Sequence, residues 1–106
     1  MMIPKHTRVE MPKLRRSAKV APVCFVCGEM NFAGTCVLMH ANWPEYGKGV
    51  GLKVHDIFGA IGCQNCHDLI DGRKGGLPVE ERKELWQRAH VKTLAWWIEN
   101  RLLKAA

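Results

Sequence analysis

Two Cys-x2-Cys pairs constrain the fold of this chain more than any other feature of its sequence. Cys24 and Cys27 form the first pair, Cys63 and Cys66 form the second, and 35 residues separate the two pairs. Four thiolates complete the tetrahedral shell of a structural zinc ion and leave no position open. A chain of 106 residues buries only a limited core, so a zinc ion that joins the two pairs would stabilise it. We therefore expect one small, zinc-stabilised domain.

The number of cysteines indicates the compartment. The chain has five cysteines, and an odd number argues against a closed disulfide framework. Paired Cys-x2-Cys spacing favours zinc in a reducing environment over an iron–sulfur centre or unrelated buried cysteines, with Cys36 left over as a buried thiol. The sequence has no apolar run of about 18 residues and no apolar signal segment near its start, so we expect a cytoplasmic protein.

Most of the excess positive charge lies at the beginning of the chain. Residues 1–22 carry a net charge of +5, and the remaining 84 residues carry +1. We predict a basic N-terminal arm over 1–22 and a zinc-binding domain over 23–106. An arm of this kind suits a polyanion such as DNA, although it could also be a solvated tail. The basic residues predicted to contact nucleic acid are Arg15, Arg16, Lys19, Arg73 and Lys74.

The pattern of apolar and turn-forming residues predicts an α+β domain. A short helix is expected over 13–20, a strand over 35–39 that leads into His40, and a second strand or turn over 54–61. A helix is expected to begin at the second cysteine pair and to end at Gly72, and a longer helix is expected over 78–104.

Spacing predicts which residues form the apolar face of the long helix. Its members are Val91, Leu94, Ala95, Ile98 and Leu102, widened by Leu85, Trp86, Trp96 and Trp97. We expect the tryptophans to pack on a small core, and the alternatives are base stacking or a face that pairs two copies of the chain.

Ligand-type side chains crowd around the second cysteine pair. His67 and Asp71 are four residues apart, so they share one face of a helix and can bind one divalent cation, Mg²⁺ or Mn²⁺. A histidine at a strand end, His40, can take a proton from water near neutral pH. Together these residues favour metal-assisted hydrolysis of a phosphodiester.

The order of these residues resembles the HNH, or ββα-metal, nucleases that carry a four-cysteine zinc. The resemblance is closer still to small phage and prophage nucleases of the YbcO type, and it covers residues 13–102. A basic run before the first cysteine pair (Leu14 to Arg16), Met39-His40, and above all the run from Asp56 to Asp71 carry it.

The resemblance implies a role for each matching residue. His40 matches the general base that activates water, and His67 matches the metal-binding histidine of the motif helix. Asp71 falls where some members place a second ligand, and Asp56 falls near the asparagine that orients the base or supports the metal. The four paired cysteines match the zinc ligands.

Two positions depart from the family pattern. Many members have Asp or His immediately before the base, where this chain has Met39, which does not bind a hard cation. The middle asparagine is not at its usual spacing, so Asp56 or His55 must substitute. Either Asp71 supplies the missing ligand, or activity is weak, or the fold is kept for binding alone.

The sequence therefore leads to three hypotheses. The first is an HNH-type DNA endonuclease of a phage or prophage, which acts on DNA rather than at a membrane. The second is a non-catalytic zinc-knuckle module that binds nucleic acid or protein. The third, a redox or metal-carrier protein, is disfavoured because no thioredoxin-like βαβ pattern is found.

Overall fold

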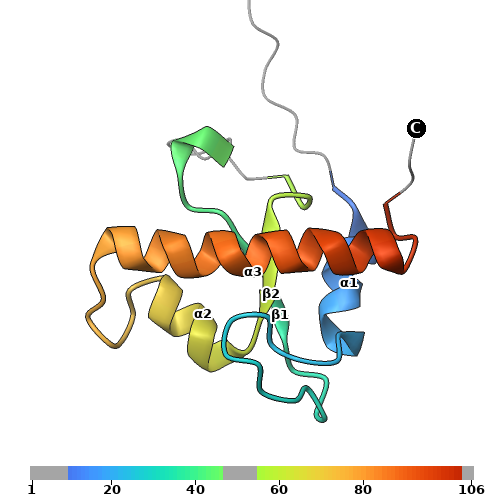
Figure 1. The fold of residues 1–106 in the computed structure, drawn as a ribbon, viewed down its shortest axis with the longest axis horizontal. Coiled ribbons are helices and arrows are strands. Elements are labelled where there is room, and N and C mark those ends of the chain that lie inside the picture. The colour runs from blue at the N-terminus through green and yellow to red at the C-terminus, as the bar shows by residue number, and fades with distance from the viewer. Residues whose placement is uncertain (1–9, 47–54, 104–106) are drawn as a thin grey trace, which may run out of the picture.

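A computed structural model describes residues 10–46 and 55–103 of the chain, and it confirms an α+β fold (Figure 1). Helices and strands alternate irregularly along the chain, and the long last helix crosses the others. In chain order the elements are α1 (Pro12–Val20), β1 (Val37–His40), the 3-10 helix η1 (Pro44–Tyr46), β2 (Gly59–Gly62), α2 (Gln64–Ile70) and α3 (Val79–Glu99). No described helix is both long and apolar enough to cross a membrane.

The two strands form a small antiparallel sheet at the centre of the fold. Val37 pairs with Gly62, and His40 pairs with Gly59. β2 is buried along its whole length, and glycine at its two ends lets β1 side chains approach closely. A Cβ added at Gly59 would lie 2.5 Å from a Leu38 methyl carbon, and one at Gly62 would lie 2.6 Å from the Met39 methyl carbon. A larger residue at either position would therefore displace these β1 side chains.

The long helix α3 covers β2, and apolar spacing predicts only part of the face that it buries. Val91 and Ile98 are 65% and 62% exposed. The buried residues of α3 are Trp86, Ala89, His90, Thr93 and Trp97. Two of these are polar, and both bind the free edge of β2: the Thr93 hydroxyl accepts the Ile61 amide at 3.0 Å, and His90 Nδ1 lies 2.7 Å from the Gly59 carbonyl. The prediction is confirmed for Trp86 and Trp97, which are buried in the core. It is wrong for Val91 and Ile98, because apolar periodicity does not count polar side chains that a strand edge satisfies.

The helix α3 ends five residues earlier than the predicted 104. Arg101 adopts the left-handed conformation with φ 58°, and its amide binds the Ile98 carbonyl at 3.1 Å. The Leu102 amide binds the Trp97 carbonyl at 2.9 Å, which completes a Schellman motif with arginine in the position that glycine usually takes. Leu102 then packs on the cluster around Trp97.

The helix α1 lies within the predicted basic arm and packs on the core. Leu14 and Ala18 are buried beside Trp97, whose indole N–H donates to the Ser17 hydroxyl at 2.8 Å. Residues 1–9 of the predicted arm lie outside the described residues. The division of the chain at residue 22 stays a prediction, and the packing of α1 counts against placing that helix outside the body of the domain.

The remaining elements fall close to their predicted positions. β1 begins two residues after the predicted 35, and α2 ends at Ile70, with Asp71 as its cap residue. The segment predicted as strand or turn over 54–61 is a turn that leads into β2 at Gly59, and Val54 lies outside the described residues. The candidate site residues lie at the end of β1 (His40), in the turn before β2 (Asp56), and on α2 and its cap (His67 and Asp71).

Candidate functional site

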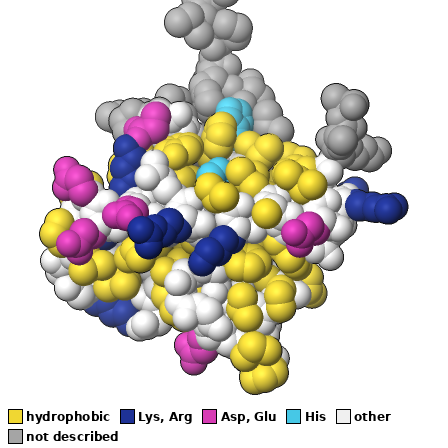
Figure 2. All heavy atoms as spheres, viewed as in Figure 1, with side chains coloured by type: hydrophobic (Ala, Val, Ile, Leu, Met, Phe, Trp, Pro, Cys, Tyr) yellow, Lys and Arg dark blue, Asp and Glu magenta, His cyan; other side chains and the backbone are white. Residues whose placement is uncertain are grey.

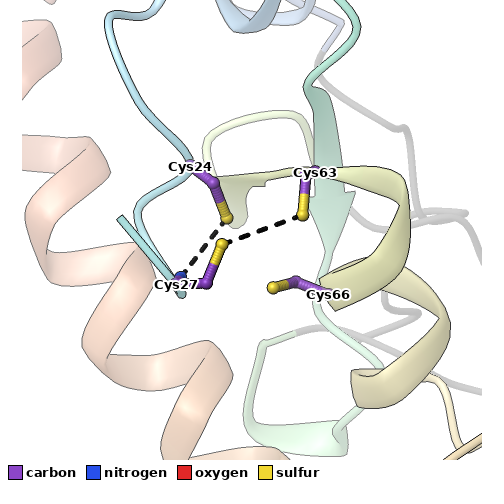
Figure 3. Close-up of side chains that lie close together, drawn as sticks. All are labelled: Cys24, Cys27, Cys63 and Cys66. Carbon is purple, nitrogen blue, oxygen red and sulfur yellow. Dashed lines mark hydrogen bonds between the residues drawn. The ribbon is translucent and has the colours of Figure 1, made fainter. Parts of the chain in front are cut away.

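The four paired cysteines converge on one point between the turn that carries Cys24 and Cys27, here called the first knuckle, and the start of α2 (Figure 3). Their sulfur atoms all lie within 4.8 Å of one another, and the Cys27 and Cys63 sulfurs are 4.0 Å apart. Zinc–sulfur bonds of about 2.3 Å in a tetrahedron place the sulfurs about 3.8 Å apart. The four side chains therefore fit a metal ion such as zinc with little movement.

The local electrostatics also favour a cation among these sulfurs. Burial alone would raise the pKa of Cys24, but backbone amides that point at its sulfur, including that of Val26 at 3.4 Å, lower the pKa to about 7. Burial and the neighbouring sulfurs raise the pKa of Cys66, and burial raises that of Cys27. A bound cation lets all four ionise together, because its charge compensates the crowded thiolates.

The fifth cysteine lies against this cluster without joining it. Cys36 is buried beside Cys24 and Cys66, as predicted, and burial raises its pKa to about 11. Its thiol therefore stays protonated at neutral pH and packs as a small apolar group.

The end of β1 carries a histidine that is held by a buried carboxylate. Met39 is buried in the core and its carbonyl accepts the Trp86 indole N–H at 2.8 Å, whereas the next residue, His40, lies on the opposite side of the strand. His40 Nε2 lies 2.8 Å from Asp56 Oδ1. A carboxylate only accepts hydrogen bonds, so Nε2 carries the proton and Nδ1 is the nitrogen that can take up another.

Asp56 is itself held in place from two more directions. Its side chain is fully buried, and Oδ2 accepts the Met11 amide at 2.6 Å. The Arg15 guanidinium lies 3.4 Å from the same oxygen. The segment that begins α1 therefore fixes the carboxylate that orients His40.

A second histidine–carboxylate pair lies on α2. His67 Nε2 lies 3.1 Å from Asp71 Oδ2, one helical turn away. His67 Nδ1 is buried and is without a hydrogen-bond partner among the described residues. Asp71 also accepts the Asn42 amide at 3.0 Å and lies 3.4 Å from Arg73.

The two pairs are linked, but they do not form one ligand cluster. In the part of the chain that the structure describes, the four cysteines are the only group of three or more metal-binding side chains that converge. Asn42 stands two residues after His40 and binds Asp71, so it ties the end of β1 to the end of α2. Sequence reasoning missed Asn42, although residues two apart on an extended segment share a side and the spacing from His40 was visible.

The basic residues predicted to contact nucleic acid differ in their surroundings. Arg16 and Lys19 are exposed on α1, whereas Arg15 is drawn to Asp56. Arg73 pairs with Asp68 and Asp71, and Lys74 binds the Asn65 side chain. Their contact with nucleic acid stays a prediction.

Two comparisons with known proteins find a match. The family described as "Putative nuclease YbcO" matches residues 13–101 of the chain. A solved structure of a "putative bacteriophage protein" from Escherichia coli str. K-12 substr. MG1655 superposes with a TM-score of 0.61 at 24% sequence identity, and it covers 84% of this chain and 100% of the other. None of the curated proteins matches.

Proposed function

The chain belongs to the YbcO family, and on that premise we propose that it is a metal-dependent DNA endonuclease of the HNH type, encoded by a phage or prophage and active in the host cytoplasm. The observation that carries the proposal is the contact of His40 with the fully buried Asp56. A histidine held in one tautomer by a buried carboxylate is the arrangement of an oriented general base.

In the proposed reaction, His40 activates water. Nδ1 takes a proton from the water, and the water oxygen forms a bond to phosphorus. The bond from phosphorus to the 3′ oxygen breaks, and this leaving oxygen takes a proton from solvent. The products are a 5′-phosphate and a 3′-hydroxyl. Asp56 stabilises the imidazolium that forms, because its charge lies 2.8 Å from Nε2.

His67 and Asp71 are the residues that would hold Mg²⁺ or Mn²⁺. The His67 imidazole, whose Nε2 faces Asp71 Oδ2 at 3.1 Å, and the Asp71 carboxylate supply two ligand groups, and Mg²⁺ commonly keeps several waters beside few protein ligands. When bound, such a cation would neutralise charge on the phosphodiester and its leaving oxygen. Asn42 holds Asp71 in place, and Arg73 beside it offers a cationic group for a phosphate.

The order of the elements supports the HNH type. β1, β2 and α2 follow one another as strand, strand and helix, with the proposed base on the first strand and the proposed cation residues on the helix. The cysteine cluster joins the first knuckle to the beginning of α2, so a zinc ion there would fix the helix relative to the sheet.

Plasmid nicking at increasing Mg²⁺ concentration tests the proposal. Protein loaded with zinc and freed of other divalent ions is incubated with supercoiled plasmid, alongside His67→Ala and the matched control Gln64→Ala from the exposed side of the same helix. We expect wild-type nicking to require Mg²⁺. His67→Ala should lose nicking or need a higher Mg²⁺ concentration, and Gln64→Ala should nick as wild type does. A nicking rate that does not depend on Mg²⁺, or that is the same in wild type and both variants, would contradict the proposed site.

A second candidate function is a zinc-knuckle module that binds nucleic acid or protein without cleaving it. It is favoured by one observation: His40, Asp56, His67 and Asp71 form two pairs rather than one convergent ligand group among the described residues. This module would be supported if zinc-loaded protein binds DNA but does not cleave it with any added divalent ion.

A further inference from the structure

A phenylalanine projects into solvent from the loop between the first cysteine pair and β1. Phe32 is 89% exposed, the highest value among the large apolar side chains that the structure describes. Met30, two residues earlier, is 54% exposed. This loop lies at the lower edge of the molecule in Figure 1, below α1, and hydrophobic side chains project at that edge in Figure 2.

Hydrogen bonds of Asn31 hold the loop against the end of α1. This residue precedes Phe32 and lies within 3.0–3.2 Å of three carbonyls at the end of α1, those of Ala18, Lys19 and Ala21. Its side-chain oxygen accepts the amides of Thr35 and Cys36, at 3.0 and 3.2 Å. One half-buried asparagine thus joins the residues before and after Phe32 to the end of α1.

The same contacts place the loop that carries Phe32 against the end of α1, whose exposed side chains are largely basic. Lys19, whose carbonyl binds Asn31, is exposed, and so is Arg16 one turn earlier. Val20, between two of the bound carbonyls, is 76% exposed. From residue 11 to residue 36 the chain has four basic side chains and one acidic side chain, Glu29. The loop that carries the exposed Phe32 therefore adjoins a cationic helix.

We propose that Phe32 stacks on an unpaired base of a single-stranded DNA segment whose phosphates lie along Arg16 and Lys19 of α1. Single-strand binding combines cationic groups that follow the backbone with exposed aromatic rings on which bases stack. A phenyl ring reads no sequence and needs a base that is free of its partner, so the inference names the substrate class as single-stranded or locally unpaired DNA. It rests on the proposed function only in taking DNA as the partner.

Binding of a fluorescein-labelled single-stranded oligonucleotide tests the inference. Fluorescence anisotropy is measured over a series of salt concentrations, with zinc-loaded protein and without other divalent ions, so that no cleavage interferes. We expect Phe32→Ser to weaken binding about ten-fold and Phe32→Trp to retain it. Because Phe32 carries no charge, the dependence of log K on log salt should be unchanged, whereas Lys19→Gln should reduce that slope by about 0.7.

Controls separate stacking from damage to the fold. Val79→Ser removes another exposed apolar side chain, at the opposite end of α3 from α1, and should bind as wild type does (Figure 1). Equal zinc content and equal thermal unfolding of Phe32→Ser and wild type show that the loop is intact.

The two proposals fail in different ways. Equal affinity of Phe32→Ser and wild type, or no binding of single strands by wild type, would overturn the stacking inference even if plasmid is cleaved. Binding that depends on Phe32, together with no cleavage at any Mg²⁺ concentration, would support the stacking inference and overturn the proposed nuclease activity.

Discussion

Replacing Asp56 with asparagine tests the histidine–carboxylate contact with almost no change of shape. Two donors, the Met11 amide and Arg15, face Oδ2, so the asparagine oxygen must take that position. Its NH₂ group then faces His40 Nε2 in place of Oδ1. Because an amide NH₂ only donates, His40 must turn to the tautomer with the proton on Nδ1. The atom proposed to accept a proton from water would then already carry one.

The structure sets the size of both effects. A hydrogen bond to a charged group contributes about 1.5–3 kcal/mol and a neutral one about 0.5–1.5 kcal/mol, so the Met11 bond weakens by about 1 kcal/mol. The half-exposed Arg15 adds less, because solvent screens it. A total loss of about 1–2 kcal/mol leaves a domain of ordinary stability folded. Loss of a general base lowers kcat by about 10²- to 10⁴-fold.

The assay compares plasmid cleavage and urea unfolding for zinc-loaded wild type, Asp56→Asn and the control Glu84→Gln. Glu84 forms an exposed ion pair with Arg88, so the substitution Glu84→Gln should change neither kcat nor stability measurably. A folded Asp56→Asn protein that cleaves at the wild-type rate would refute the assignment of Asp56 as the residue that orients the base.

Three further changes test the metal site and the core. Cys63→Ser, or zinc removal by a chelator, should abolish cooperative unfolding seen by circular dichroism, because structural zinc contributes about 10–16 kcal/mol; unchanged unfolding would contradict a structural metal. Thr93→Val leaves the buried Ile61 amide without its acceptor and should cost about 1–3 kcal/mol in urea unfolding, and a loss below about 0.5 kcal/mol would count against this contact. Burial lowers the pKa of His90, so unfolding takes up a proton below about pH 6.5 and stability falls as pH drops toward the folded pKa. His90→Gln should therefore lose less Tm than wild type between about pH 7.5 and pH 5.5, and an equal loss would exclude this titration.

Local patterns predicted the elements that depend on local interactions. Cys-x2-Cys spacing needs only a turn or the first turn of a helix to bring two sulfurs together, so the convergence of Cys24, Cys27, Cys63 and Cys66 was visible in the sequence. The i, i+4 spacing of a histidine and an aspartate likewise predicted their contact on α2.

Contacts across the fold could not be predicted in the same way. The face of α3 is set by the free edge of a two-stranded sheet, where the Ile61 amide and the Gly59 carbonyl need partners, and His90 and Thr93 supply them. The end of α3 depends on Arg101 in a conformation that usually indicates glycine. The Met11 amide on Asp56 joins segments 45 residues apart, and no spacing rule reports such a pair.

The most direct test of the proposed nuclease is the initial rate of plasmid nicking by zinc-loaded His40→Ala beside wild type, at saturating Mg²⁺ and neutral pH. Removing the base from the end of β1 should lower this rate about 10²-fold or more, while the protein keeps its zinc and remains folded at the assay temperature. Equal rates for the two proteins would contradict the role of His40 and with it the proposed mechanism.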